Sequence, residues 1–223
     1  MKPMTEHHLA ILRRHMVEIV DMHYDLASDE IGRGALSAEL RRAMLDVPRH
    51  LFVPAALAAV AYHDTPLPIG FDKTLSQPFI GALMLELLAV GPGQKVLEVG
   101  TGLGWQAAVM AELGADVFSV EIVEEFAQAA RLRLAALDYG VEIRVGDGSR
   151  GWTEHAPFDK VLVTAATDWP PQALVDQLAV GGDIVMPLGG KDVQQLTVLT
   201  KQGDGNLEAR SVLPVRFTQL ETA

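Results

Sequence analysis

The sequence contains no cysteine. This absence excludes a disulfide framework, a thiolate nucleophile and a metal site built on sulfur ligands. It also suits the reducing cytosol, where disulfides are rare. With 223 residues, 49% of them hydrophobic, the chain is long enough to bury one substantial core, and we expect a single domain.

Long hydrophobic runs and positive charge are scarce as well. No stretch approaches the roughly 20 apolar residues that span a bilayer, and the N-terminal "MKPMTEHHLAILRRHM" lacks the apolar region and cleavage site of a secretory signal. Lys and Arg number 18 against 29 Asp and Glu, which gives a net charge of -11 without any basic tract. A local basic groove stays possible, but affinity for nucleic-acid phosphates is not expected. We therefore expect a cytoplasmic protein that binds neither membranes nor nucleic acids.

The first part of the chain has a helical rhythm. Apolar residues recur at helical spacing from about residue 6 to residue 57, and Ser37 is placed to cap a helix that begins at about Ala38. The prolines of "PRHLFVP" and "DTPLPIG" then predict an irregular connector that ends at "TLSQPF". We expect residues 1–90 to form a helical N-terminal segment within the same domain as residues 91–223.

The second part alternates short apolar runs with helical stretches. The runs "KVLEVG", "DVFSVE", "VEIRVGD", "KVLVTAA" and "DIVMPLG" have no polar alternation, which is typical of strands buried on both faces of a parallel sheet. The last segment, "QQLTVLTKQGDGNLEARSVLPVRFTQL", reads as two strands around a polar turn. The sequence therefore predicts an α/β protein with a doubly wound, mainly parallel sheet that ends in an antiparallel hairpin.

A glycine-rich turn follows the first of these strands. In "EVGTGLGWQ", Gly100, Gly102 and Gly104 are spaced by two, between a predicted strand and a predicted helix. Glycine allows tight turns and close approach of a ligand to the backbone, although such a turn alone is weak evidence. The next strand ends in Glu121, whose carboxylate could accept both ribose hydroxyls of a nucleoside.

Two cofactor classes fit this arrangement. A nicotinamide site also uses a later acidic residue, but its fingerprint is G-x-G-x-x-G, and Trp105 stands where the third glycine would fall. A G-x-G-x-G turn with an acidic residue at the end of the second strand resembles the nucleoside site of S-adenosylmethionine-dependent methyltransferases. The third strand then ends in "GDG", where Asp147 could accept a hydrogen bond from the adenine amino group.

Ser76 of "TLSQPF" has three possible roles. It could be a nucleophile, a cap for the helix that follows, or a donor that holds a carboxylate. A serine hydrolase is disfavoured because Ser76 does not stand in a G-x-S-x-G elbow. Capping stays open at this point. His7, His8, His15 and His23 lack any HExxH motif, so we expect a solvated helix face and no metal site.

The order of several motifs is more specific than any one of them. "VPRHLFVP", "AYHDTPLPIG", "TLSQPF", "VLEVGTGLGWQAAVMAEL", "VGDGSRGW", "APFDKVLVTAA" and "GGDIVMPLG" together resemble the protein-L-isoaspartate O-methyltransferase family over roughly residues 13–190. The resemblance implies a Rossmann-like methyltransferase fold, in which residues 1–90 serve as a lid over substrate and cofactor and residues 91–223 form the core. It implies methyl transfer from S-adenosylmethionine to the free α-carboxylate of isoaspartyl residues, with S-adenosylhomocysteine as product. The methyl ester then closes to a succinimide that reopens in part as normal aspartate.

The resemblance also implies roles for individual residues. Ser76 matches the active-site serine of the family, and the partners are isoaspartyl proteins or peptides, with a monomer favoured. Cofactor contacts are implied for Thr74, Gln77, Gly100, Thr101, Gly102, Gly104, Glu121, Asp147 and Gly148, and substrate contacts for Tyr62, Asp64 and Thr218.

Three features depart from the pattern of the family. Trp105 stands where many members have Tyr, and Phe71 and Asp72 stand where the family often has a small, glycine-containing stretch. The ending "VRFTQL" replaces a Phe-Val-Pro-Leu-like strand that grips the substrate. Two alternatives therefore stay open: a methyltransferase for an aspartate side chain of a dedicated peptide, and a homologue that binds the cofactor without turnover.

Overall fold

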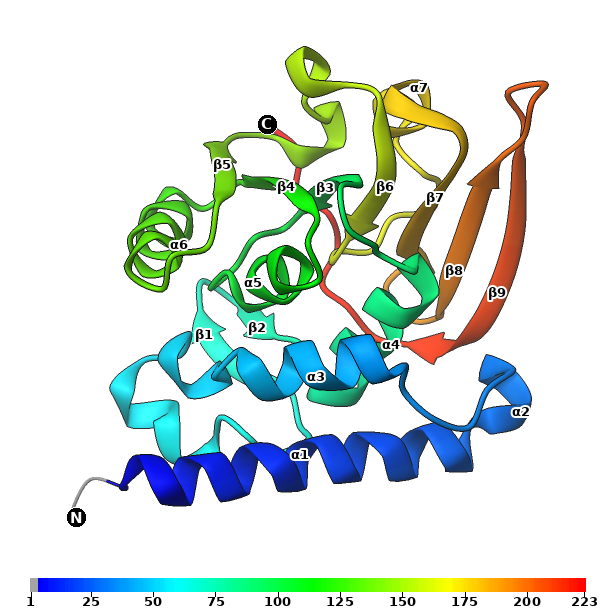
Figure 1. Ribbon diagram of the computed structural model, residues 1–223. Helices are drawn as coiled ribbons and strands as arrows, with labels where there is room; N and C mark the ends of the chain where they lie inside the picture. The colour runs from blue at the N-terminus through cyan, green and yellow to red at the C-terminus, as the bar shows by residue number, and fades with distance from the viewer. Residues whose placement is uncertain (1–3) are drawn as a thin grey trace.

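Seven strands form one sheet in the part of the chain that the computed structural model describes, residues 4–223 (Figure 1). Their order is β5-β4-β3-β6-β7-β8-β9. Pairing is parallel from β5 to β7, whereas β8 and β9 pair antiparallel at the far edge. The predicted doubly wound sheet and its C-terminal hairpin are therefore confirmed. The strands are β3 (Lys95–Val99), β4 (Asp116–Glu121), β5 (Val141–Val145), β6 (Phe158–Val163), β7 (Leu178–Gly189), β8 (Gln194–Lys201) and β9 (Leu207–Val215).

The central strand β3 is buried on both faces, as its mainly apolar run predicts. Val96 packs into a hydrophobic cluster on one face, whereas Leu97 and Val99 pack into a second cluster on the other. The same prediction is wrong for β5, which lies at the edge of the sheet and exposes Glu142 and Val145. Four helices supply most of the helical side chains that meet the sheet: α4 (Pro78–Leu88), α5 (Trp105–Glu112) and α6 (Glu124–Ala136) in the first cluster, and α7 (Gln172–Gln177) in the second. Short 3-10 turns lie at Gly148–Arg150 and Thr153–His155.

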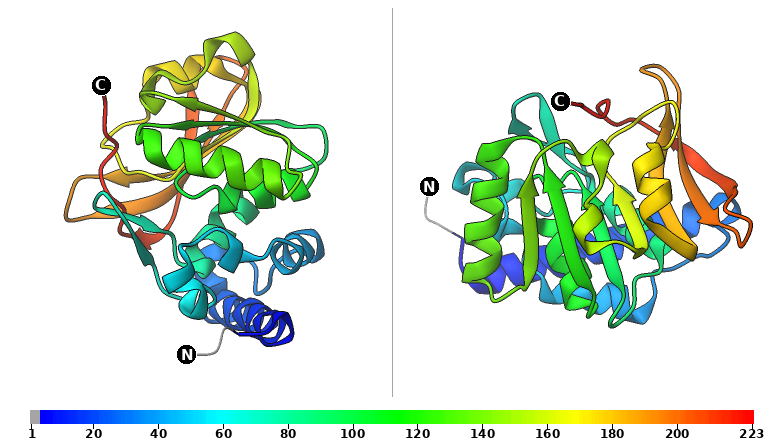
Figure 2. Two further views of the ribbon diagram at one scale, coloured as in Figure 1. Left: turned by 90° about the vertical axis from the view of Figure 1, so that its left-hand side faces the viewer. Right: turned by 90° about the horizontal axis from the view of Figure 1, so that it is seen from above.

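The N-terminal helices form an outer layer on the face of α4 and α5 (Figures 1 and 2). They are α1 (Glu6–Leu26), α2 (Ser28–Ile31) and α3 (Ala38–Asp46), followed by 3-10 turns at Arg49–Leu51 and Ala55–Val60. Ser37 Oγ accepts a hydrogen bond from Leu40 N at 3.3 Å, which confirms the predicted cap of α3. One hydrophobic cluster contains residues from α1 and α3 together with residues of the sheet, so the layers share a core.

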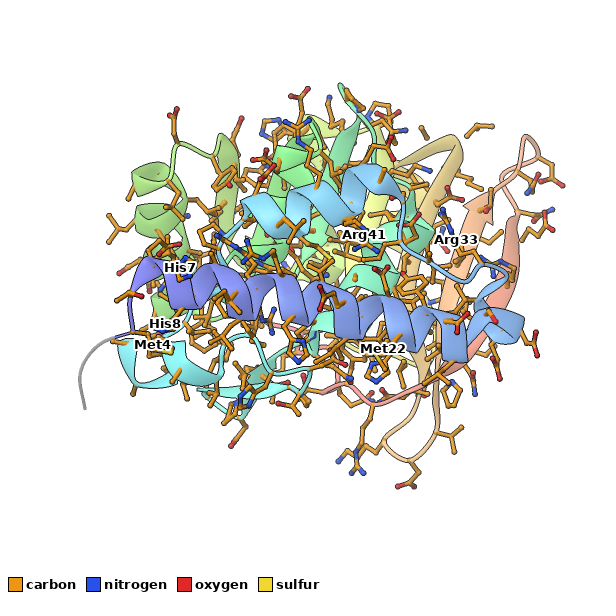
Figure 3. All side chains as sticks on the ribbon, turned by 60° about the horizontal axis from the view of Figure 1, so that its bottom comes forward. Met4, His7, His8, Met22, Arg33 and Arg41 are labelled. Carbon is orange, nitrogen blue, oxygen red and sulfur yellow. The ribbon has the colours of Figure 1, made fainter. Side chains whose placement is uncertain are left out.

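Two ion pairs stabilise this outer layer, and their arginines, Arg33 and Arg41, are labelled in Figure 3. Arg41 of α3 pairs with Asp21 of α1, and Arg33 pairs with Glu86 of α4. His7, His8 and His15 are exposed, whereas His23 is half-buried, with its Nδ1 2.7 Å from Asp64 Oδ2. The expected solvated face thus covers three of the four histidines. None of the helices in residues 4–223 combines the length and hydrophobicity of a membrane span.

The connector before α4 contains a hairpin that the sequence did not predict. Strands β1 (Leu67–Gly70) and β2 (Lys73–Leu75) pair antiparallel around a turn at Phe71 and Asp72, whose φ angles are 52° and 54°. Tight hairpin turns with positive φ usually contain Asn or Gly, so a Phe-Asp pair gives no sequence indication of one. The ring of Phe71 packs edge-on against Phe126 of α6, with the centroids 5.3 Å apart, and this contact holds the turn against the core.

Candidate active site

A cavity of about 540 Å³ opens at the carboxyl ends of β3 and β6. The strand order reverses between these two strands, and such a switch point is where open α/β sheets bind ligands. Its wall combines the glycine turn after β3, the β1–β2 hairpin with the segment before α4, and the residues that follow β9. The sequence-predicted residues that line it are Thr74, Ser76, Gln77, Gly100, Thr101, Gly102, Glu121, Gly148 and Thr218.

The glycines of the turn have different structural roles. Gly100 has a φ of 96°, and a Cβ there would lie 2.3 Å from Thr164 Oγ1, so the position leaves no room for a side chain. Gly104 does not line the cavity. It is the N-cap residue of α5, and a Cβ there would press on Ala130 and Leu134 of α6 at 3.2–3.3 Å. The first glycine therefore shapes the site, and the last allows close helix packing.

Glu121 is fixed in place at the end of β4. Its side chain is nearly buried, Oε2 accepts from Gly102 N at 2.7 Å, and Oε1 accepts from Val123 N at 2.9 Å. Each carboxylate oxygen has more than one lone pair, so both can still accept a hydroxyl from a molecule in the cavity. The carboxylate thus links the glycine turn to the position where a ribose is expected.

A second acid, Glu98, lies buried behind the turn. Ser119 Oγ donates to Glu98 Oε2 at 2.6 Å and lies 2.5 Å from Thr101 Oγ1, whereas Glu98 Oε1 has no partner within residues 4–223. Burial raises the pKa of Glu98 from 4.5 to about 8; the Ser119 hydrogen bond opposes this rise and the charge of Glu121 adds to it. At neutral pH Glu98 is therefore largely protonated.

Ser76 lies half-buried on the cavity wall, and its hydroxyl makes no hydrogen bond within the described residues. Helix α4 begins at Pro78 with Gln77 as N-cap and without a side-chain cap. The interpretation of Ser76 as a helix cap is therefore wrong. The cavity leaves this hydroxyl free to donate to a bound molecule.

Asp64 supports the segment from outside the cavity. Its Oδ1 accepts from Phe79 N and its Oδ2 from Gln77 Nε2, both at 2.8 Å. The side chain is only 6% exposed and does not line the cavity. Asp64, and not Ser76, therefore caps the start of α4. It also fixes the orientation of the Gln77 side chain.

Tyr62 and Asp147 also lie outside the cavity lining. Tyr62 is buried, and its hydroxyl lies 2.7 Å from His50 Nδ1. The carboxylate of Asp147 accepts from Ser149 N and Oγ at 2.9 and 2.6 Å and from Ala223 N at 3.2 Å. Contact of Asp147 with adenine stays a prediction.

The segment after β9 returns across the carboxyl ends of the strands toward β5 (Figure 1). Ala166 N donates to Thr218 O at 2.8 Å, and Leu220 N donates to Ala166 O at 2.7 Å. Lys73 of the β1–β2 hairpin pairs with Glu221 across the cavity. Sequence patterns gave no indication of this pair, because its partners lie far apart in the chain.

The buried position of Glu98 makes stability depend on pH. The folded protein keeps this proton to about pH 8, whereas the unfolded chain loses it near pH 4.5, so the stability from the extra proton is lost as pH rises between these values. Glu98→Gln mimics the protonated acid. We expect its free energy of unfolding, relative to wild type, to rise from pH 5 to about pH 8 by up to about 1.4 kcal/mol per pH unit and to level off at higher pH. Urea unfolding at several pH values measures this, and a difference that does not change with pH would contradict the assignment.

Gly100→Ala tests the close approach of the turn to Thr164. We expect a loss of about 1–3 kcal/mol in the free energy of unfolding, because alanine combines a clash with an unfavourable positive φ. Gly140→Ala is the matched control, since no atom lies within 4 Å of its Cβ and its φ is not positive. Urea unfolding measures the stability of both variants. Titration with S-adenosylhomocysteine measures their affinity for this ligand and shows whether the turn contributes to binding. Equal behaviour of the two variants would show that the turn tolerates a side chain.

Comparison with known proteins finds matches in one family. A family model described as "Protein-L-isoaspartate(D-aspartate) O-methyltransferase (PCMT)" matches residues 22–223. Protein-L-isoaspartate O-methyltransferase 1 of Polaromonas sp. is 48% identical over 221 residues, which cover 99% of this chain and 94% of the relative. A protein-L-isoaspartate O-methyltransferase of Methylorubrum populi is 51% identical over 195 residues, 87% of this chain and 92% of the relative.

Solved structures agree with the fold. A structure described as a protein-L-isoaspartate O-methyltransferase superposes with a TM-score of 0.80 at 28% identity; it covers 93% of this chain, which spans 65% of that longer chain. A second structure, a protein from Plasmodium falciparum, also has a TM-score of 0.80 at 21% identity, with 95% of this chain and 99% of that chain covered. The chain therefore belongs to the protein-L-isoaspartate(D-aspartate) O-methyltransferase family.

Proposed function

We propose that this protein transfers the methyl group of S-adenosylmethionine to the free α-carboxylate of L-isoaspartyl residues in peptides and proteins. Membership of the family implies this activity, because relatives about half identical to the chain over most of its length are named for it. One observation carries the assignment of the site: the unbonded Ser76 hydroxyl lines the same cavity as Glu121 and the glycine turn. The methyl ester would then close to a succinimide, which begins repair.

The residues present fit the cofactor. The cavity of about 540 Å³ has room for a nucleoside together with an amino-acid moiety. Glu121 offers two fixed acceptor oxygens for ribose hydroxyls, and the turn at Gly100 and Gly102 lets the backbone approach a ligand closely. Thr74 and Gln77 line the same cavity, and we propose that they flank the methionine end.

The reaction needs no general base. An isoaspartyl α-carboxylate has a reference pKa near 4 and is already an anionic nucleophile at neutral pH. S-adenosylmethionine, when bound, supplies an electrophilic methyl group on a positively charged sulfur. The chain has to desolvate the carboxylate, orient one oxygen and exclude water, and such positioning is worth about 7 kcal/mol or more. The Ser76 hydroxyl donates to the carboxylate and aims it.

Residues 1–90 would act in this scheme as the lid. The β1–β2 hairpin supplies Lys73 and Thr74 to the wall, and the Lys73–Glu221 ion pair joins the hairpin to the C-terminal segment over the cavity. Thr218 lies exposed at the rim, where the "VRFTQL" ending would meet the substrate. The cytoplasmic location and the monomeric state stay predictions.

Selectivity tests the proposed substrate. We expect an isoaspartyl peptide to be methylated at least about a hundredfold better, in kcat/KM, than the same peptide with normal aspartate, because one displaced methylene removes the carboxylate from its aligned position. Transfer of radiolabelled methyl groups to the two peptides measures both rates. Equal rates would favour an enzyme for aspartate side chains, and binding of S-adenosylmethionine with no transfer to either peptide would favour the non-catalytic alternative.

A further inference from the structure

Arg49 is a buried cation directly behind the active site. Its side chain is 0% exposed, yet within residues 4–223 it forms no ion pair with a carboxylate. Nε donates to Ala61 O at 2.9 Å, Nη2 donates to Ser76 O at 2.6 Å, and Nη1 has no partner in the described residues. An unpaired buried charge is costly, so its presence calls for a compensating role.

The guanidinium contacts two residues that line the cavity, Ser76 and Trp105. It holds the carbonyl of Ser76 on one side, and its Cζ lies 4.6 Å from the centroid of the Trp105 ring on the other. Trp105 is the first residue of α5, directly after the glycine turn, and it lines the cavity as Ser76 does. Arg49 therefore connects the serine segment to the start of the cofactor helix.

The charge persists at neutral pH. Burial lowers the pKa of Arg49 to about 9, while the negative charge of Asp64 opposes this decrease, so the side chain stays protonated at pH 7. The carboxylate of Asp64 is itself engaged by Gln77 and Phe79 N. The positive potential of Arg49 is therefore not cancelled by a direct partner at the serine segment.

We propose that Arg49 is a positioning residue that stabilises the acceptor carboxylate, both by holding the Ser76 backbone and by placing behind it a positive charge that has no ion-pair partner. This inference rests on the proposed function. The substrate anion loses water when it enters the cavity, and a fixed cation that is already desolvated offsets part of that cost.

The test compares two peptides that differ only in charge. One contains an isoaspartyl residue, and the other has the neutral α-carboxamide in place of its α-carboxylate. Their dissociation constants are measured calorimetrically on the protein saturated with S-adenosylhomocysteine, which lacks the sulfonium charge. We expect wild type to prefer the carboxylate at least about tenfold, since a charge-assisted hydrogen bond and the nearby cation both favour the anion.

Variants at Arg49 separate charge from structure. Arg49→Gln should reduce the carboxylate preference by about tenfold or more, and Arg49→Lys should retain most of it even where both peptides bind more weakly. Arg131→Gln is the matched control. Arg131 also donates to a backbone carbonyl, that of Ile143, at 3.2 Å through Nε and at 2.8 Å through Nη2, but it does not line the cavity. That control should leave the preference unchanged.

Each outcome decides between the two roles. If the role of Arg49 is purely structural, Arg49→Gln should weaken the binding of both peptides in equal proportion. That result would overturn the proposal. Should Arg49→Gln not fold, Arg49→Lys carries the comparison, and a wild-type ratio near one would still overturn the proposal because it excludes a stabilising charge. If neither peptide binds to wild type, the proposed substrate is wrong instead, and the two failures stay distinguishable.

Discussion

One buried carboxylate, that of Asp64, fixes the segment on which the site depends. Helix α4 begins with proline, and the side chain of its N-cap residue Gln77 makes no capping hydrogen bond to the helix. Asp64 accepts from Phe79 N and from the Gln77 amide instead, so a residue of the preceding connector satisfies the helix start. The Ser76 hydroxyl therefore makes no capping hydrogen bond and is free to face the cavity. If Asp64 were absent, both the helix start and the serine would lose their orientation.

The site is assembled from segments that are distant in sequence. The glycine turn and Glu121 come from the sheet edge, where parallel strands end together. The segment at Ser76 and Gln77 lines the same cavity and is supported by Asp64 and Arg49. The residues after β9 then close the cavity through backbone hydrogen bonds with Ala166 and the Lys73–Glu221 ion pair. Methyl transfer to a carboxylate requires alignment more than proton movement, and a site held from three sides suits that requirement.

Much of this could be predicted from the sequence, where local patterns determine local structure. The mainly apolar central strands, the Ser37 cap and the glycine turn each follow from a short-range rule. Sequence reasoning failed where a long-range contact replaced a local one. The capping of α4 by Asp64, the burial of Arg49 and the contact between Asp147 and Ala223 depend on tertiary packing. The hairpin at residues 67–75 was missed because its turn residues, Phe71 and Asp72, are unusual at positive φ.

The central claim is that Ser76 orients a carboxylate and does not attack the substrate. Steady-state kinetics of Ser76→Ala on one isoaspartyl peptide, with calorimetric titration of S-adenosylhomocysteine, test it most directly. The account predicts a decrease in kcat/KM of about ten- to a few hundredfold, the size of one lost hydrogen bond to a charged group, with cofactor affinity nearly unchanged. Complete loss of activity, together with a covalent adduct on wild type in intact-protein mass spectrometry, would contradict the account, and so would full activity in the variant.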